Sequence, residues 1–231
     1  MDTAVEAGAH PYPLQIAKQT EAFIAASVWH VSFLDVAAGR YIRLPWGLWR
    51  VRRMFKVTDS AWQRGLQSFL SHRQVFEKSV MQTIVVSLKS QWDWFVTKSG
   101  EFVIFAQTCE SKHSLSSKKI IELKSIGQNK PIEQQIEILS RATGVDFLLP
   151  QSTKEAIQEL TLVRNLGIHN RWEVDEKYLK RSINAANWEI GELRTVSVDE
   201  VELWEKSTLT LLRNVSFPMA FRYGSAPSYP E

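Results

Sequence analysis

The stretch "ELTLVRNLGIHNRWEVDEKYL", residues 159–179, decides how the chain is interpreted. Apolar residues recur at helical spacing from about Ser152 into this stretch, which predicts a helix there. The stretch carries Arg164 and, five residues later, His169. Side chains at this spacing point about 140° apart on an ideal helix. They converge only if the backbone deforms or ends between them, which Gly167 permits at low steric cost.

The two side chains have chemistry that suits one kind of reaction. Arginine is a permanent cation whose planar fork matches phosphate. Histidine has an unperturbed pKa of about 6.5, which suits proton transfer near neutral pH. Arg164 and His169 together could bind a phosphodiester and move protons on it, as metal-free RNA cleavage requires. The other interpretation is a helix-end pair that binds backbone carbonyls and the helix dipole.

The residues around the pair resemble a known family. Residues 159–179 are similar to the signature helix of the HEPN superfamily, named for higher-eukaryote and prokaryote nucleotide-binding proteins. The family motif is an arginine, often followed by a polar residue, with a histidine a few positions later. Arg164-Asn165 and His169 match it with four residues between arginine and histidine. Asn170 and "VDEKYL" (174–179) resemble the flanks of the RiboL-PSP and MAE-like bacterial branch. The resemblance covers about residues 75–190.

This resemblance implies an all-α fold and a metal-independent endoribonuclease that needs no cofactor. The fold would be an up-and-down helical bundle of HEPN type with additional N-terminal helices. RNA would be cut by attack of the 2′-OH, which leaves a 2′,3′-cyclic phosphate and a 5′-OH. His169 would act as general acid and base, Arg164 would neutralise charge on the phosphate, and Asn165 would orient the pair.

The family also implies supporting residues. Asn170 is one candidate, and Asp93, in "SQWDWF", is the candidate for a helix-borne acid beside the site. The other interpretation of Asp93 is a solvated or capping carboxylate between two tryptophans. Some family members carry a tyrosine two residues after the histidine, which a nucleotidyltransferase antitoxin modifies. This chain has Arg171 at that position, so the resemblance does not support that form of control.

Family members act as toxins or as effectors in phage defence, and others have lost activity. A toxin or antiviral effector, regulated by an antitoxin or another protein, is therefore the first hypothesis. A catalytically silent dimerisation or partner-binding module is the alternative. Because one Arg–His pair offers few groups to hold a phosphodiester, we predict a twofold homodimer whose interface lies beside residues 164–170. Its buried core is expected to include Leu162, Leu166, Trp172 and Trp92.

Periodicity and capping residues divide the chain into helices. After a loose leader over residues 1–13, we expect helices over about 14–38, 59–97, 131–144, 152–169, 175–190 and 199–214, the last capped by Asp199. Residues 98–105 could be extended or a short helix, and 111–119 an exposed loop. We divide the chain into an N-terminal helical extension of unknown role (1–75), a HEPN-like bundle (76–222) and a disordered tail (223–231).

Charge is unevenly distributed along the chain. Residues 40–53 hold five arginines and no acid, whereas residues 173–205 hold nine acids against four basic residues. The basic stripe could follow an RNA backbone with its tryptophans stacked on bases. The interpretation that we favour is a loop whose tryptophans pack on the core while its arginines pair with the acidic region. The RNA-binding candidates are Arg50, Arg52 and Arg53, with Trp46 and Trp49 beside them.

Composition indicates a folded, cytoplasmic protein. Of 231 residues, 44% are hydrophobic and 23% are charged. The single cysteine, Cys109, excludes an intrachain disulfide and is typical of a reducing compartment. The most apolar window, residues 23–38, is too short to span a bilayer, so we expect no membrane partner. The five histidines do not form pairs at metal-ligand spacing, so we expect no metal site.

Overall fold

The computed structural model describes residues 4–5, 7–35, 73–110, 115–128 and 130–230. All regular elements of these residues are helices, and their only β interaction is an isolated bridge between Glu173 and Leu193. The predicted all-α class is therefore confirmed for the described part of the chain. The helices are α2 (Pro11–Asp35), α5 (Arg73–Glu110), α6 (Ser117–Lys124), α7 (Ile132–Thr143), α8 (Gln151–His169), α9 (Glu176–Leu179), the 3-10 helix η2 (Ala185–Asn187) and α10 (Val198–Arg222).

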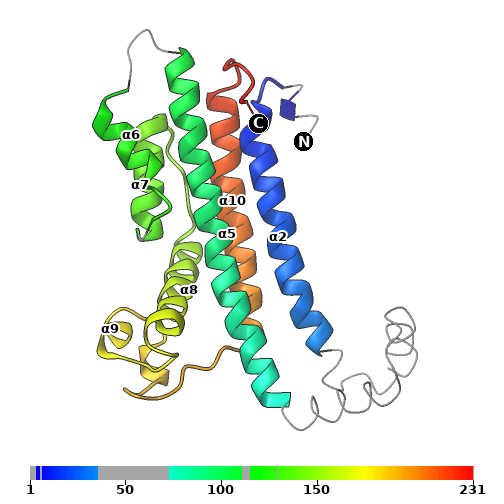
Figure 1. Cartoon of the computed structure of the whole chain (residues 1–231), viewed down its shortest axis with the longest axis vertical. Coiled ribbons are helices and arrows are strands. Elements are labelled where there is room, and N and C mark those ends of the chain that lie inside the picture. The colour runs from blue at the N-terminus through cyan, green and yellow to red at the C-terminus, as the bar shows by residue number, and fades with distance from the viewer. Residues whose placement is uncertain (1–3, 6, 36–72, 111–114, 129, 231) are drawn as a thin grey trace, which may run out of the picture.

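Three long helices, α2, α5 and α10, run side by side along the molecule (Figure 1). In this view α2 runs antiparallel to α5 and α10. α8 packs against both α5 and α10, and the short α6 and α7 lie against α5. Ile24 of α2, Phe95 of α5, Val163 of α8 and Leu212 of α10 belong to one buried core. The described part of the N-terminal region is therefore a helix of the bundle itself.

The N-terminus of α2 differs from the expected loose leader. Pro11 and Pro13 lie in the first turn of this helix, where a proline is tolerated because its missing N–H needs no partner. The predicted end of the first helix near residue 38 and the predicted start of the second at residue 59 lie outside the described residues. None of the described helices combines the length and the apolar composition that crossing a membrane requires.

Residues 98–105 are neither extended nor a separate helix, because α5 continues through them to Glu110. Gly100 lies where α6 crosses closely: a Cβ atom at Gly100 would be 2.7 Å from the carbonyl oxygen of Leu123. Phe102 and Val103 are fully buried in the core. Gly100 therefore serves close packing between α5 and α6.

The predicted ends of α7 and the predicted course of α8 are confirmed. Gly144 ends α7 with φ of 69°, a left-handed conformation that glycine adopts without strain. α10 was predicted to begin with Asp199 as its cap, which is wrong. Ser197 caps it instead, in a reciprocal capping box with Glu200. α10 also continues past the predicted end at 214, through Pro218 to Arg222.

The helix predicted over 175–190 is wrong. Only α9, four residues long, and η2 form there. Asp175 caps α9 by accepting a hydrogen bond from the Tyr178 N–H at 2.7 Å. The chain then turns away because Ser182 donates its hydroxyl hydrogen to Glu159 of α8, at 2.8 Å. A side-chain contact to another helix therefore outweighs local helix propensity.

The tail, residues 223–230, packs on the bundle, so the predicted disorder is wrong for these residues. Tyr229 lies against Tyr12, with ring centroids 4.2 Å apart, and meets Phe105 edge-on. His10 Nε2 donates to the carbonyl oxygen of Pro227 at 3.1 Å, while His10 Nδ1 accepts from the Tyr12 N–H. The tail is mostly polar in composition, but its aromatic rings provide the apolar contacts that hold it on the bundle.

Candidate active site

The Arg164–His169 motif occupies the last two turns of α8. This helix buries an apolar face that includes Val163 and Leu166 against the bundle. Arg164 and Asn165 lie at the edge of that face and are half-buried. His169 is the last residue of α8 and is exposed. The motif thus combines one side chain at the helix packing boundary with one in solvent.

Arg164 and His169 point in different directions. α8 is unbroken from Gln151 to His169, and Gly167 is not among the residues with positive φ. Five residues of regular helix place the two side chains about 140° apart. The expectation that the backbone bends or ends at Gly167 is therefore wrong. Within one chain, Arg164 and His169 lie on different faces of α8.

Gly167 instead makes room for the indole of Trp172. A Cβ atom at Gly167 would lie 2.3 Å from Cζ2 and 2.6 Å from Cε2 of that ring. The chain returns over α8 through Arg171 and Trp172, whose φ angles of 51° and 70° are unfavourable for residues with a side chain. The Trp172 N–H donates to the Leu166 carbonyl at 3.0 Å, and the Trp172 carbonyl accepts from the Arg194 N–H at 2.8 Å. These contacts fix the turn that follows the motif.

Asn170, predicted to support the site, closes the helix. Its backbone N–H donates to the Leu166 carbonyl at 2.9 Å. Its side-chain amide donates to the carbonyl of Glu173, whose N–H donates back to the Asn170 carbonyl. Asn170 therefore shapes the turn beside His169 through backbone contacts.

Arg164 has few partners among the residues that the structure describes. Its Nη1 donates to Oδ1 of Asn165 at 3.0 Å, which fits the orienting role expected of Asn165. Its Nε is buried and has no hydrogen-bond partner there. A buried N–H without an acceptor is unfavourable, and an oxygen of a bound anion would satisfy this one once the side chains that cover it move aside. This guanidinium therefore has spare capacity to bind an anion.

Asp93 lies on α5 in a polar cluster rather than as an isolated carboxylate. Its Oδ1 accepts from the Lys89 ammonium and from Nε2 of Gln135, the latter at 3.1 Å. Gln135 Oε1 in turn accepts from the Trp92 indole at 2.6 Å. Lys89 and Gln135 are buried, and the side chain of Asp93 is 25% exposed. Asp93 is therefore neither simply solvated nor a cap.

Lys89 links this cluster to the motif, and sequence reasoning missed it. Burial lowers the pKa of the Lys89 ammonium, Asp93 opposes this, and the charge of Arg164 lowers the pKa further. The two cations therefore lie near one another across the α5–α8 contact, with Asp93 as the carboxylate bound to Lys89. The i,i+4 spacing of Lys89 and Asp93 on a predicted helix was the available signal.

The segment after the motif is a folded support for α8. Val174 is buried, and Tyr178 donates its hydroxyl hydrogen to Glu159 of α8 at 2.6 Å. Burial, together with this hydrogen bond to Glu159, raises the pKa of Tyr178 to about 12, so the hydroxyl stays protonated. The "VDEKYL" part of the family resemblance therefore has a structural explanation in this chain.

A buried ion cluster fastens the same support. Arg194 is 1% exposed and forms ion pairs with Glu159, at 3.8 Å, and with Glu200. Its Nε donates to the Tyr178 hydroxyl at 2.9 Å, and its guanidinium lies 4.5 Å from the centroid of the Trp188 ring. Burial alone would raise the pKa of Glu200, but hydrogen bonds from Arg194 and from Ser197 outweigh it and lower that pKa.

The residues expected to form the core of a dimer interface are in the core of the chain itself. Leu162, Leu166 and Trp92 are buried, and Trp172 packs partly buried against the same core. They face inward because α8 needs them to pack on the bundle. Exposed apolar residues at this end of the molecule include Ile168, Ile183, Ile190 and Leu193.

The remaining candidates lie elsewhere or outside the described residues. The RNA-binding candidates Arg50, Arg52 and Arg53, with Trp46 and Trp49, lie outside the described residues. Cys109 is free and exposed at the far end of α5. Among the residues that the structure describes, no group of three or more His, Cys, Asp or Glu side chains could hold a metal ion.

Comparisons with known proteins do not assign the chain to a family. No family model matches it, and neither does a curated protein or a solved structure.

Proposed function

We propose that this chain is a metal-independent endoribonuclease of HEPN type that acts as a homodimer, in the role of a toxin or an antiviral effector. One observation carries the proposal. The last two turns of α8 present a guanidinium with a buried, unsatisfied Nε and a hydrogen bond to Asn165, and an exposed imidazole at His169. The first suits a phosphate oxygen, and the second can reach solvent and substrate.

In the proposed reaction, the ribose 2′-oxygen attacks the adjacent phosphorus and the bond from phosphorus to the 5′-oxygen breaks. A His169 imidazole accepts the proton of the 2′-OH, and an imidazolium donates a proton to the leaving 5′-oxygen. Arg164 stabilises the additional negative charge on the phosphate oxygens. The products are a 2′,3′-cyclic phosphate and a 5′-OH, so atoms and charge balance without a metal.

The divergence of Arg164 and His169 is the reason for proposing a shared site. Because the two side chains of one α8 are about 140° apart, a second copy must supply groups that the first cannot direct at the same phosphate. Ile168 and Leu193 are each 47% exposed, and Ile190 is 64% exposed. An isologous contact that covers these side chains would bring the two His169 residues near one another.

The chemistry is tested with purified protein and RNA in excess chelator. The proposal expects cleavage products with a cyclic phosphate and a 5′-OH, and loss of at least about 100-fold in rate for His169→Ala. Arg213→Ala, which removes an exposed arginine of α10 paired with Glu21, is the matched control for Arg164→Ala. Dependence on Mg²⁺, a 5′-phosphate product, or equal rates for both arginine variants would contradict the mechanism.

A catalytically silent module is the second candidate, and the same divergence favours it. If no partner completes the site, Arg164 and His169 serve only the end of α8. Expression in cells separates the two. Growth arrest by the native chain, relieved by Arg164→Ala or His169→Ala but not by Arg213→Ala, supports the enzyme. Equal growth with all four chains supports the module.

A further inference from the structure

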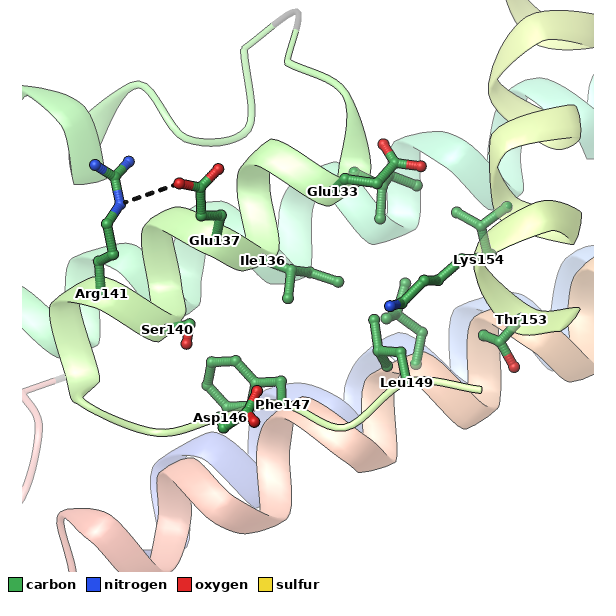
Figure 2. A pocket seen from close by; sticks show the side chains of 13 residues that line it. Glu133, Ile136, Glu137, Ser140, Arg141, Asp146, Phe147, Leu149, Thr153 and Lys154 are labelled. Carbon is green, nitrogen blue, oxygen red and sulfur yellow. Dashed lines mark ion pairs between the residues drawn. The ribbon is translucent and has the colours of Figure 1, made fainter. Parts of the chain in front are cut away.

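A cavity lies near the beginning of α8, away from the motif. It has a volume of about 310 Å³, is partly open to solvent, and is lined by α7, the connection 146–149, the first turns of α8, and α10 (Figure 2). The α8 residue of the lining that lies nearest to the motif is Ile157, twelve residues before His169. At 1.5 Å per residue the two are about 18 Å apart along the helix. The cavity is therefore separate from the candidate active site.

The inner surface of the cavity is apolar. Its volume is at the lower end of the range of small-molecule sites, about 300–1,000 Å³. With roughly 30 Å³ for each non-hydrogen atom, as in liquid water, it accommodates about ten such atoms. The apolar lining residues are Ile132, Ile136, Phe147, Leu149, Ile157 and Leu211.

Two polar side chains of α8 in this lining have no partner among the residues that the structure describes. Thr153 is only 6% exposed, yet its hydroxyl makes no hydrogen bond within the described residues. Lys154 forms no ion pair there, and Figure 2 shows its amine pointing into the cavity. The first turn of α8 carries no acid, and Pro150 provides no side-chain cap. The positive end of this helix therefore adds to the charge of Lys154.

The acids of the rim lie away from Lys154. Glu137 is paired with Arg141 at 3.7 Å. In Figure 2 the Glu133 carboxylate points away from the cavity, and Asp146 lies on the side opposite Lys154, beside Phe147. The end of the cavity next to α8 is therefore cationic, while its floor is apolar.

We propose that this cavity binds a small amphiphilic carboxylate. The aliphatic or aromatic body, about ten non-hydrogen atoms in all, packs on the isoleucines of α7 and α8. The carboxylate pairs with the Lys154 ammonium, which points into the cavity. This inference does not rest on the ribonuclease proposal, because none of these residues belongs to the motif.

Methyl-labelled protein titrated with octanoate, and in parallel with octylamine and 1-octanol, tests the site by NMR. We expect saturable shifts of the Ile132, Ile136 and Ile157 methyls with octanoate, and none at the exposed Ile121 and Ile183. Octanoate should bind more tightly than octanol, and octylamine more weakly.

Lys154→Glu should weaken octanoate binding about five-fold or more and leave octanol binding nearly unchanged, because it reverses a single solvent-exposed charge at the mouth of the cavity. Lys118→Glu, at an exposed lysine of α6, is the control and should bind octanoate as the native chain does. The proposal is overturned if octanoate produces no saturable shift, if octylamine binds as tightly as octanoate, or if the two lysine variants behave alike.

Discussion

Replacing Gly167 with alanine tests how the end of α8 is built. In an exposed helix interior this change stabilises a protein by about 0.5–1 kcal/mol, because alanine restricts the unfolded chain and favours helix. Here the added Cβ atom would lie 2.3 Å, 2.6 Å and 2.8 Å from three atoms of the Trp172 ring. Ordinary contact begins near 3.5 Å, so the indole must move by about 1 Å.

The indole cannot move freely, because the backbone of Trp172 is held on both sides. Its N–H binds the Leu166 carbonyl and its own carbonyl binds the Arg194 N–H. Overpacking of this kind costs about 1–3 kcal/mol. Subtracting the gain in helix propensity, we expect Gly167→Ala to reduce the free energy of unfolding by about 1–2 kcal/mol.

Urea unfolding followed by far-ultraviolet circular dichroism measures this, provided that the m-values of the variants agree. The matched control is the same substitution in a Trp172→Ala chain, where the obstruction is absent. There Gly167→Ala should be neutral or stabilise by up to about 1 kcal/mol, so its sign reverses. Stabilisation by Gly167→Ala in the native chain would show that Trp172 does not approach the helix closely.

Three further predictions concern the polar clusters beside the motif. Arg194→Met should lower the free energy of unfolding by about 3 kcal/mol, because Glu159 would stay buried without its cation. Arg213→Met, at an exposed ion pair, should change it by less than about 1 kcal/mol. Equal effects of the two substitutions would contradict the buried cluster. Asp93→Asn should destabilise by about 2 kcal/mol because it leaves the buried Lys89 without a carboxylate, and Lys89→Met in the same chain should restore most of the loss in a double-mutant cycle. The lowered pKa of Glu200 contributes stability that is present above the unfolded pKa of about 4.3 and is lost as pH falls through the folded pKa. Glu200→Gln should therefore flatten the acid side of a plot of unfolding free energy against pH. An unchanged slope would contradict the pairing with Arg194.

Most of the fold could be predicted from local sequence, because the signals were local. Gly144 ends α7 as a left-handed cap, and the apolar spacing before Arg164 gives α8. The Ser197 capping box of α10 was a local signal that the prediction of Asp199 overlooked. Two other errors arose where contacts with other elements decide the local structure. Residues 98–105 were expected to leave the helix, but α5 continues through them, and Gly100 allows α6 to approach α5. The helix expected after Asp175 ends early because Ser182 binds Glu159, which is 23 residues earlier in the chain.

The candidate site was less predictable than the fold. Gly167 was interpreted as a flexible point, yet its role depends on Trp172, whose left-handed backbone no local pattern indicates. The partners of Asp93 come from α5 and α7 together, and Lys89 escaped notice because a lysine is seldom buried. Leu162 and Leu166, expected at the dimer interface, are buried inside the bundle instead. The apolar character of a helix residue does not reveal whether it packs within its own chain or against a partner.

The claim that two copies of α8 share one ribonuclease site is tested most directly by mixing chains. Native protein is equilibrated with increasing excess of His169→Ala protein, and the rate of RNA cleavage in chelator is measured per native chain. If each site needs the imidazoles of both protomers, the rate falls as mixed dimers form, towards zero at large excess. Full activity per native chain at every ratio, or cleavage by a protein that stays monomeric in light scattering, would contradict the account.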